Sequence, residues 1–318
     1  MTSPRPLAAN NQQANSPGVG LVDAHQHFWE VAAHDQPWLR LPGNETLLRD
    51  FTESDLRPLA RAAGVTATVV VQTIADPAET PELLELAAAS DLVAGVVGWA
   101  DLQSDRITDT LAALQERPDG AFLRGIRHPV LIEPDPDWLR RPAVHRGLAA
   151  VGVAGLCYDI VVPATVLPAA IDAVAACPGT TFVLDHLGNP DLADHPDAAW
   201  TAAIRRLGAL ANTYCKLSGI LAEPPPGPDE AASLALLRPY YEIALESFGP
   251  DRLMFGSDWP PCTTSSSYAQ VAERARALIA PLTDPEQTAI LATTARRAYR
   301  LAPPAHNAPD NPDNPEIR

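Results

Sequence analysis

The segment Leu21–Phe28 reads LVDAHQHF, an apolar start followed by the polar residues His25, Gln26 and His27. Short apolar or β-branched runs of this kind recur along the chain, and Ala/Leu-rich segments with helical spacing separate most of them. The predicted strands are Leu21–Phe28, Ala67–Ile74, Val93–Trp99, Leu123–Val130, Val153–Val162, Thr181–Leu187, Thr213–Ile220 and Leu253–Ser257. The predicted helices include Thr108–Glu116, Val166–Ala176, Ala199–Leu210, Leu234–Ser247 and Tyr268–Ile279.

The spacing of these runs indicates the fold class. Consecutive predicted strands begin about 33 residues apart, which is the length of a βα unit. Eight such units predict a closed (β/α)8 TIM barrel of the α/β class. A doubly wound sheet is the alternative, but its phosphate-binding motifs GxGxxG and GxxxxGK[ST] are absent from the sequence. We therefore predict one barrel domain over residues 21–302, with disordered tails at 1–20 and 303–318.

Charge and composition exclude several classes of partner. The 318 residues include 23 Lys and Arg against 39 Asp and Glu, a net charge of −16. A charge of this sign repels phosphate, so we expect neither nucleic acid nor an anionic membrane as a partner, and a small molecule remains. The sequence lacks a membrane-spanning apolar run and the apolar core of a signal peptide, and its four cysteines are scattered. We expect a cytoplasmic protein and predict no particular oligomeric state.

Polar residues at the ends of the predicted strands point to the chemistry. Catalytic groups of a parallel barrel collect at the carboxyl ends of its strands. His25 and His27 alternate along one strand, so both imidazoles should face inward and form a chelate suited to zinc. His186 and Asp258 end the sixth and eighth predicted strands. The alternatives are a histidine pair hydrogen bonded in a polar core, a bond from His186 to Asp185, and a structural capping role for Asp258.

Further polar residues on the predicted strands are candidates for substrate binding. Arg124 and Arg127 belong to the same predicted strand and are expected to share one face, where guanidinium groups suit a carboxylate or ring hydroxyls. The alternative is that they pair with some of the many carboxylates. His128 and Tyr158 extend this set of candidates, whereas Lys216 fits a structural ion pair at least as well as a functional role.

The connection after the first predicted strand is long and rich in tryptophan. It runs from Trp29 to about Phe51, and loops of this length in compact domains often form lids or binding loops. Trp29, together with Trp259 after the eighth strand, is expected to stack on a sugar ring or to exclude solvent. The alternative is that both indoles pack the loop onto the rim of the barrel.

Seven motifs, in order along the chain, resemble the amidohydrolase superfamily, in the branch that includes sugar lactonases and 2-pyrone-4,6-dicarboxylate lactonase. They are Val22–Trp29, Pro37–Leu39, Leu48–Phe51, Arg124–His128, Leu184–Gly188, Cys215–Gly219 and Arg252–Pro260. The resemblance runs from about Val22 to Leu301. It implies a barrel hydrolase that uses His25, His27, His186 and Asp258.

The chain also departs from the wider superfamily. Many members add a bridging Lys or Glu on strand four and a histidine on strand five, and neither is present here. The resemblance therefore implies a single divalent metal, zinc or manganese, held by His25, His27 and Asp258 with His186. A metal-independent site is the alternative, because this branch includes enzymes thought to work without metal. Asn189 stands where sugar lactonases often have a lysine, which leaves the particular substrate open.

The function we predict is hydrolysis of a small lactone, either of a sugar acid or of a carboxylated ring. Asp258 would take a proton from the attacking water, and His186 with the other histidines or a bound metal would stabilise the oxyanion. Two alternatives remain at this point. One is a metal-dependent non-oxidative decarboxylase of a small carboxylic acid, and the other is a catalytically inactive barrel that binds a small acid or sugar.

Overall fold

The computed structural model describes residues 20–193, 195–222 and 229–302. The predicted tails at 1–20 and 303–318 lie outside these residues, apart from Gly20. Among the described residues no helix has the length and apolar character needed to cross a membrane.

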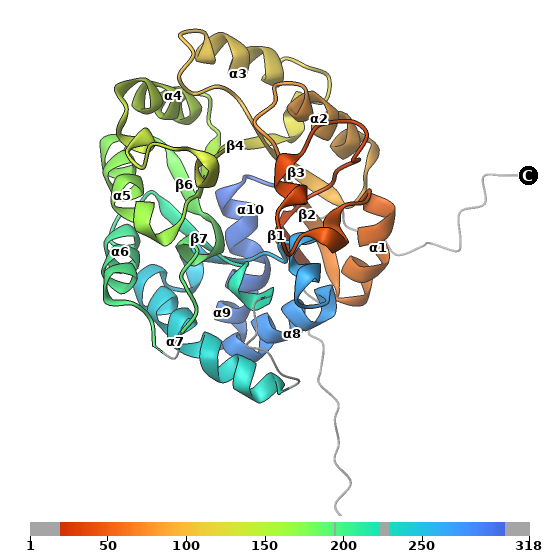
Figure 1. The fold of residues 1–318 in the computed structure, drawn as a ribbon, viewed down its shortest axis with the longest axis vertical. Helices are drawn as coiled ribbons and strands as arrows, with labels where there is room; N and C mark the ends of the chain where they lie inside the picture. Colours follow the sequence, from red (N-terminus) through yellow and green to blue (C-terminus); the bar gives the residue numbers. More distant parts are fainter. Residues whose placement is uncertain (1–19, 194, 223–228, 303–318) are drawn as a thin grey trace, which may run out of the picture.

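Eight parallel strands form a single sheet in the order β1 to β8, which confirms the predicted (β/α)8 barrel (Figure 1). The strands are β1 (Leu21–Gln26), β2 (Val65–Val71), β3 (Val93–Gly98), β4 (Leu123–Pro129), β5 (Cys157–Val161), β6 (Thr181–Leu184), β7 (Thr213–Leu217) and β8 (Leu253–Phe255). A parallel bridge between Gln26 and Trp259 joins the first strand to the end of the last. All eight strands overlap the segments predicted from the sequence.

Helices α1 to α8 surround the strands (Figure 1), and two short helices follow them in the chain. They are α1 (Glu53–Ala62), α2 (Glu79–Ala89), α3 (Ile107–Gln115), α4 (Pro142–Val153), α5 (Leu167–Ala176), α6 (Ala198–Gly208), α7 (Glu230–Phe248), α8 (Tyr268–Ile279), α9 (Asp284–Thr288) and α10 (Thr294–Ala298). Helix α6 shows how the sequence specifies them. Asp197 caps its first turn, and the buried residues Trp200, Ile204 and Leu207 recur at the helical period on the face toward the barrel.

The C-terminal segment closes one end of the barrel. Helix α10 lies in the middle of the ring of strands (Figure 1), and Ala298 packs with residues from the amino-terminal halves of the strands, such as Val22 and Cys157. The Cys157 thiol donates to the Ala298 carbonyl at 2.9 Å, and the Tyr299 hydroxyl donates to Asp159 at 2.7 Å. A ligand therefore has to enter at the opposite end, where the strands finish.

All eight strands end one to three residues earlier than predicted, and after two of them the next residues bend over the mouth of the barrel. Strand β6 stops at Leu184, and His186 and Leu187 follow with φ of 54° and 51°. Strand β8 stops at Phe255, and Asp258 has a φ of 57°. Such left-handed backbone is uncommon for residues with a side chain and often marks functional sites. Here it directs His186 and Asp258 across the mouth.

Close packing between α4 and the chain after β3 gives a test of the fold. A Cβ at Gly147 would overlap the backbone carbonyl of Leu102, whereas a Cβ at Gly179 would meet nothing within 4 Å. We expect Gly147→Ala to lower the free energy of unfolding by about 1–3 kcal/mol, as overpacking does. Gly179→Ala is the matched control and should change it by less than about 0.5 kcal/mol or raise it slightly. Urea unfolding of both variants measures the difference, and equal values would contradict the packing described.

Candidate active site

Three imidazoles and one carboxylate converge at the mouth of the barrel. The Nε2 atoms of His25 and His27 are 3.1 Å apart. Asp258 Oδ1 lies 3.6 Å from each of these nitrogens and 4.0 Å from Nε2 of His186. The four residues that the sequence placed at three different strand ends therefore meet around one point.

A bulge in β1 gives the two histidines their direction. Asp23 pairs with Thr68 while Gln26 pairs with Val70, so β1 uses one more residue than β2 over this stretch. Asp23 turns outward and accepts hydrogen bonds from the Ser257 backbone amide and from the Tyr268 hydroxyl. The inner side is crowded, since a Cβ at Gly256 would lie 2.7 Å from Cβ of His25.

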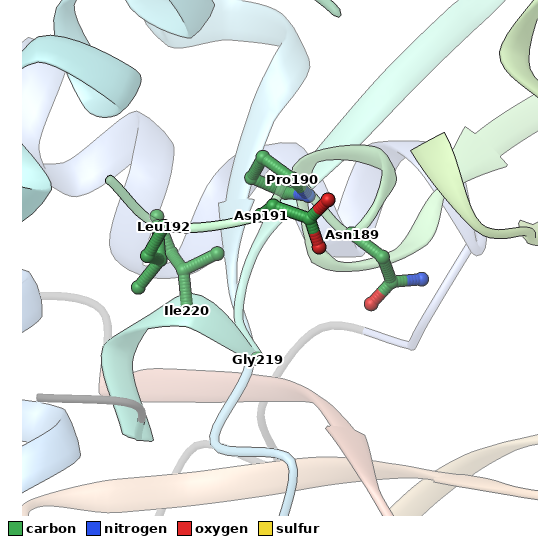
Figure 2. A pocket seen from close by; sticks show the side chains of 6 residues that line it. All are labelled: Asn189, Pro190, Asp191, Leu192, Gly219 and Ile220. Carbon is green, nitrogen blue, oxygen red and sulfur yellow. The ribbon is translucent and has the colours of Figure 1, made fainter. Parts of the chain in front are cut away.

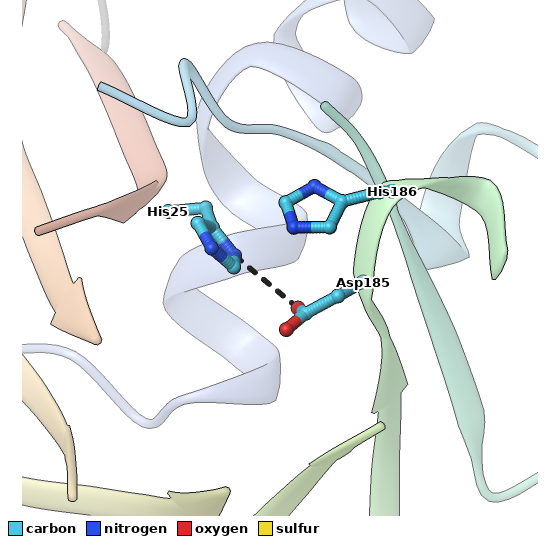
Figure 3. A group of neighbouring side chains, drawn as sticks. All are labelled: His25, Asp185 and His186. Atoms are coloured by element: carbon cyan, nitrogen blue, oxygen red, sulfur yellow. Dashed lines mark ion pairs between the residues drawn. The ribbon is translucent and has the colours of Figure 1, made fainter. Parts of the chain in front are cut away.

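The other ring nitrogen of each histidine has a hydrogen-bond partner. Nδ1 of His27 lies 2.7 Å from the Val71 carbonyl, and Nδ1 of His186 lies 2.9 Å from the Ser218 hydroxyl. Nδ1 of His25 lies 3.2 Å from Asp185, as the dashed line in Figure 3 marks. A metal ion requires the tautomer with hydrogen on Nδ1, in which each Nε2 directs its lone pair toward the shared point.

A buried ion network lies directly beneath His25. Lys216 is the only lysine of the sequence and its side chain is fully buried. Its Nζ lies 2.6 Å from Asp159, 3.0 Å from Asp185 and 3.0 Å from Nδ1 of His25. Burial opposes the charges on Lys216 and Asp185, but their attraction outweighs it, raising the pKa of Lys216 and holding that of Asp185 well below its ordinary value. The ion-pair alternative for Lys216 agrees with these contacts.

The electrostatics of the converging groups favour an ionised acid between neutral bases. Burial raises the pKa of Asp258, but the three neighbouring histidines outweigh it and hold that pKa below the usual range. Burial, followed by the charge of Lys216, lowers the pKa of His25 well below its ordinary value, and burial also lowers the pKa of His27. At neutral pH Asp258 is therefore a carboxylate, while His25 and His27 are uncharged.

Three of the four groups, His27, His186 and Asp258, form part of the floor of a cavity of about 780 Å³, and His25 lies buried behind them. Arg127 lies on the same floor, where it donates to Asp185 at 3.2 Å and to the Gln72 carbonyl. The walls come from the loops after the strands and are largely apolar. The lining residues with apolar side chains are Pro37, Trp38, Leu41, Ile74, Ala75, Pro129, Leu131, Ile132, Val161 and Pro261. The cavity therefore combines a charged floor with apolar walls.

Three predicted substrate contacts lie outside this cavity. Arg124 is three residues from Arg127, an odd number, so the two do not share a face as expected; it lies beside Gly95 and Leu301. Tyr158 packs in the core against Phe182. His128 stacks on Trp138 and is hydrogen bonded to Trp99 and Glu133. None of the three is among the cavity-lining residues.

The two tryptophans Trp29 and Trp259 pack the loop after β1 onto the rim of the barrel, which was the alternative to stacking on a sugar ring. Trp29 is buried against Trp38 and Phe51 and donates to the Arg49 carbonyl, and an antiparallel bridge to Phe51 anchors the loop. Trp259 is buried and packs on Phe51 from the barrel side. Both indoles therefore fasten the loop to the rim, and Trp38 is the one that lines the cavity.

Residues that the sequence analysis did not single out form much of the wall. Leu131 and Ile132 follow β4, and Leu41 follows the 3₁₀ turn Pro37–Arg40. Thr73 lies just after β2. The adjacent apolar pair Leu131-Ile132, in a loop flanked by Pro129 and Glu133, was the only signal, since loops are ordinarily polar.

The donor set fits a metal ion. In the tautomer with hydrogen on Nδ1, two Nε2 lone pairs face each other at 3.1 Å with a carboxylate at 3.6 Å, and a cation between them would remove their repulsion. Zinc–nitrogen bonds of about 2.0–2.1 Å in tetrahedral geometry separate ligand atoms by about 3.3 Å, close to the spacings of His25, His27 and Asp258. Outer nitrogens bonded to a carbonyl and a carboxylate are also typical of metal-binding histidines.

Comparison with known proteins agrees with the fold and with this site. The sequence model of a family described as amidohydrolase matches residues 22–301. The chain belongs to the amidohydrolase family. This amidohydrolase is 38% identical over 296 residues to the L-fucono-1,5-lactonase of Burkholderia multivorans (strain ATCC 17616 / 249). The match covers 91% of this chain and 98% of that protein.

Two further relatives are similarly close. The L-fucono-1,5-lactonase of Burkholderia ambifaria is 37% identical over 241 residues, covering 75% of the amidohydrolase described here and 80% of that protein. The crystal structure of an amidohydrolase from Burkholderia multivorans with bound zinc has a TM-score of 0.82 and 37% identity, covering 89% of this chain and 99% of that chain. The resemblance found in the motifs is confirmed along nearly the whole barrel.

Removing the buried ammonium group of Lys216 should lower the stability of the protein strongly. Lys216→Met would leave Asp159 and Asp185 buried with less compensating charge, so we expect the free energy of unfolding to fall by about 3–5 kcal/mol. Arg205→Met is the matched control, because Arg205 pairs with Glu246 on the surface and should contribute at most about 1 kcal/mol. Chemical unfolding measures both variants. A Lys216→Met protein as stable as the control would contradict the network.

Proposed function

We propose that this amidohydrolase hydrolyses a sugar-acid lactone at the floor of the cavity. The observation that carries the proposal is the ionised Asp258 among three inward-facing imidazoles, with Arg127 beside them. The names of the two relatives, L-fucono-1,5-lactonase, support a sugar lactone as the class of substrate. The buried free cysteines support a cytoplasmic setting, in which the enzyme would act in carbohydrate metabolism.

In the proposed reaction Asp258 accepts a proton from water as the water oxygen attacks the lactone carbonyl carbon. The carbonyl oxygen gains negative charge, and the ring C–O bond then breaks. Asp258 returns its proton to the departing alkoxide, which leaves an open-chain hydroxy acid. A positioned carboxylate contributes roughly 100- to 10,000-fold to such a step. The low pKa of Asp258 keeps it ionised and ready to accept the proton at neutral pH.

Arg127 is a fixed positive charge that lines the cavity beside these groups. Its Nη1 lies 3.5 Å from Nε2 of His25, and its bonds to Asp185 and to the Gln72 carbonyl hold the guanidinium in place. A preorganised cation stabilises an oxyanion without having to reorient during the reaction. We assign Arg127 to the carbonyl oxygen or to a neighbouring oxygen of the substrate.

We propose further that one divalent metal, zinc or manganese, binds to His25, His27 and Asp258, with His186 as the adjacent fourth group. The facing lone pairs support this site, and the zinc in the Burkholderia multivorans structure supports it independently. When bound, the metal supplies Lewis-acid polarisation of an oxygen atom. Lys216 and Asp185 would hold the outer nitrogen, Nδ1, of His25 whether or not the metal is bound.

Replacing the proposed base tests the mechanism. We expect Asp258→Asn to lower kcat for sugar 1,5-lactones by roughly 100- to 10,000-fold, because an amide cannot accept the proton from water. The rate of acid release during lactone hydrolysis measures kcat for both proteins. Asp172→Asn is the control, since Asp172 pairs with Arg140 on the surface and does not line the cavity. Undiminished turnover by a folded Asp258→Asn protein would show that Asp258 is not the base.

Metal content tests the second part of the proposal. We expect about one equivalent of metal per chain, loss of lactone hydrolysis on chelation, and loss of the metal in His25→Ala, because a site of this kind needs its full ligand set. Elemental analysis and activity before and after chelation measure these. Full activity without metal would make the histidines substrate contacts. Release of carbon dioxide from small carboxylic acids instead of lactone opening would favour the decarboxylase alternative.

A further inference from the structure

The mouth of the cavity has exposed apolar side chains that the proposed chemistry does not use. Leu41 is 58% exposed, Leu131 is 50% exposed and Ile132 is 71% exposed. They line the same cavity as His27 and Asp258 but come from the loops after β1 and β4. Exposing an apolar side chain to water is unfavourable, and such clusters beside a cavity often mark a binding surface.

These residues are unusual within this chain. The described part of the chain exposes seven large apolar side chains, and three of them line this one cavity. Trp38 and Ile74 add to the apolar part of the lining of this cavity, which also contains His27 and Asp258. The wall is therefore continuous with the site at which the ring would react, and a group attached to the ring could reach it.

The cavity is also larger than a hydroxylated lactone ring requires. Cavities of 300–1,000 Å³ take drug-sized ligands, and this one measures about 780 Å³. A sugar ring presents hydroxyls that need polar partners, and the cavity offers these at Arg127, His186 and Asp258 on the floor and at Asp35, Thr73, Asp76 and Asn189 elsewhere in its lining. The wall formed by Leu41, Leu131 and Ile132 offers no side-chain hydrogen-bonding group, so it does not suit a second hydroxylated ring.

We infer that the substrate is a lactone that carries an apolar substituent larger than a methyl group, which lies between Leu41 of one loop and Leu131 and Ile132 of the other. The inference rests on the proposed lactone hydrolysis and names the class of lactone. The ring carbonyl has to approach Asp258 at the floor, so substituents on the far side of the ring point toward the mouth. In a sugar 1,5-lactone the exocyclic carbon on C5 projects outward from the ring, and we place the substituent at this position.

A second cavity shows where a polar extension would lie instead. It measures about 320 Å³ and is lined by Asn189, Pro190, Asp191, Leu192, Gly219 and Ile220. Figure 2 shows the polar side chains of Asn189 and Asp191 apart from Leu192 and Ile220. Asn189 lines both cavities, so the two adjoin. Because the larger cavity has the apolar wall, an apolar substituent is expected to select it.

The experiment compares two 1,5-lactones with the same ring hydroxyls, one with a methyl group on C5 and the other with a pentyl group. Burial of each methylene contributes a factor of roughly three to four. We expect kcat/KM for the pentyl lactone to exceed that for the methyl lactone by at least about tenfold. Equal values, or a preference for the methyl lactone, would overturn the inference.

Variants locate the effect. The double variant Leu131→Ser with Ile132→Ser should reduce the pentyl-to-methyl ratio of kcat/KM to within about threefold of unity, because the apolar wall is lost. Val153→Ser is the matched control: Val153 ends α4, is 88% exposed and does not line the cavity, so the ratio should not change. An unchanged ratio in the double variant would place the preference elsewhere and overturn the inference.

Binding of the two ring-opened acids separates the inference from the proposed function. Calorimetry should give a lower Kd for the pentyl acid than for the methyl acid, by a similar factor, whether or not lactones are hydrolysed. A preference in binding without turnover would retain the apolar subsite and reject lactone hydrolysis. Turnover of both lactones without a preference would retain lactone hydrolysis and reject the apolar subsite.

Discussion

A cation sealed inside the barrel organises the rest of the site. Lys216 has no contact with water, so its ammonium group depends on Asp159 and Asp185 for compensation. Asp185 contacts His25 and Arg127 as well, and Tyr299 of the C-terminal segment bonds to Asp159. The same network therefore connects the closed end of the barrel with the reactive end. The other 22 cationic side chains are arginines, which indicates that this position needs a compact ammonium group.

The fold and the reactive centre were largely predictable because both depend on short-range patterns. Parallel strands buried on both faces are apolar, so the polar residues that end them stand out in the sequence. This picked out His25, His27, His186 and Asp258, which the structure brings together. The bulge in β1 and the positive φ at two strand ends could not be read from the sequence. They set the directions of the side chains without changing the pattern of residue types.

The substrate contacts were harder to predict because they depend on the face of the strand on which each side chain lies and on the conformation of the loops. Arg124 and Tyr158 resemble Arg127 in being polar groups on strands, yet a shift of one position moves a side chain to the other face. The walls depend on loops, whose shape follows from long-range contacts such as the packing of Trp29 on Phe51. Leu131 and Ile132 become significant only when their loop is placed over the cavity.

These two levels of predictability correspond to two parts of the enzyme. The floor is built on strand ends, and contacts of the outer ring nitrogens with Val71, Asp185 and Ser218 restrain its histidines. The walls are built on loops that contribute little to the barrel and can vary without disturbing it. Chemistry should therefore be shared with relatives that have the same floor, whereas the choice of lactone follows the walls. For this reason a relative's name supports the reaction more strongly than it supports the particular substrate.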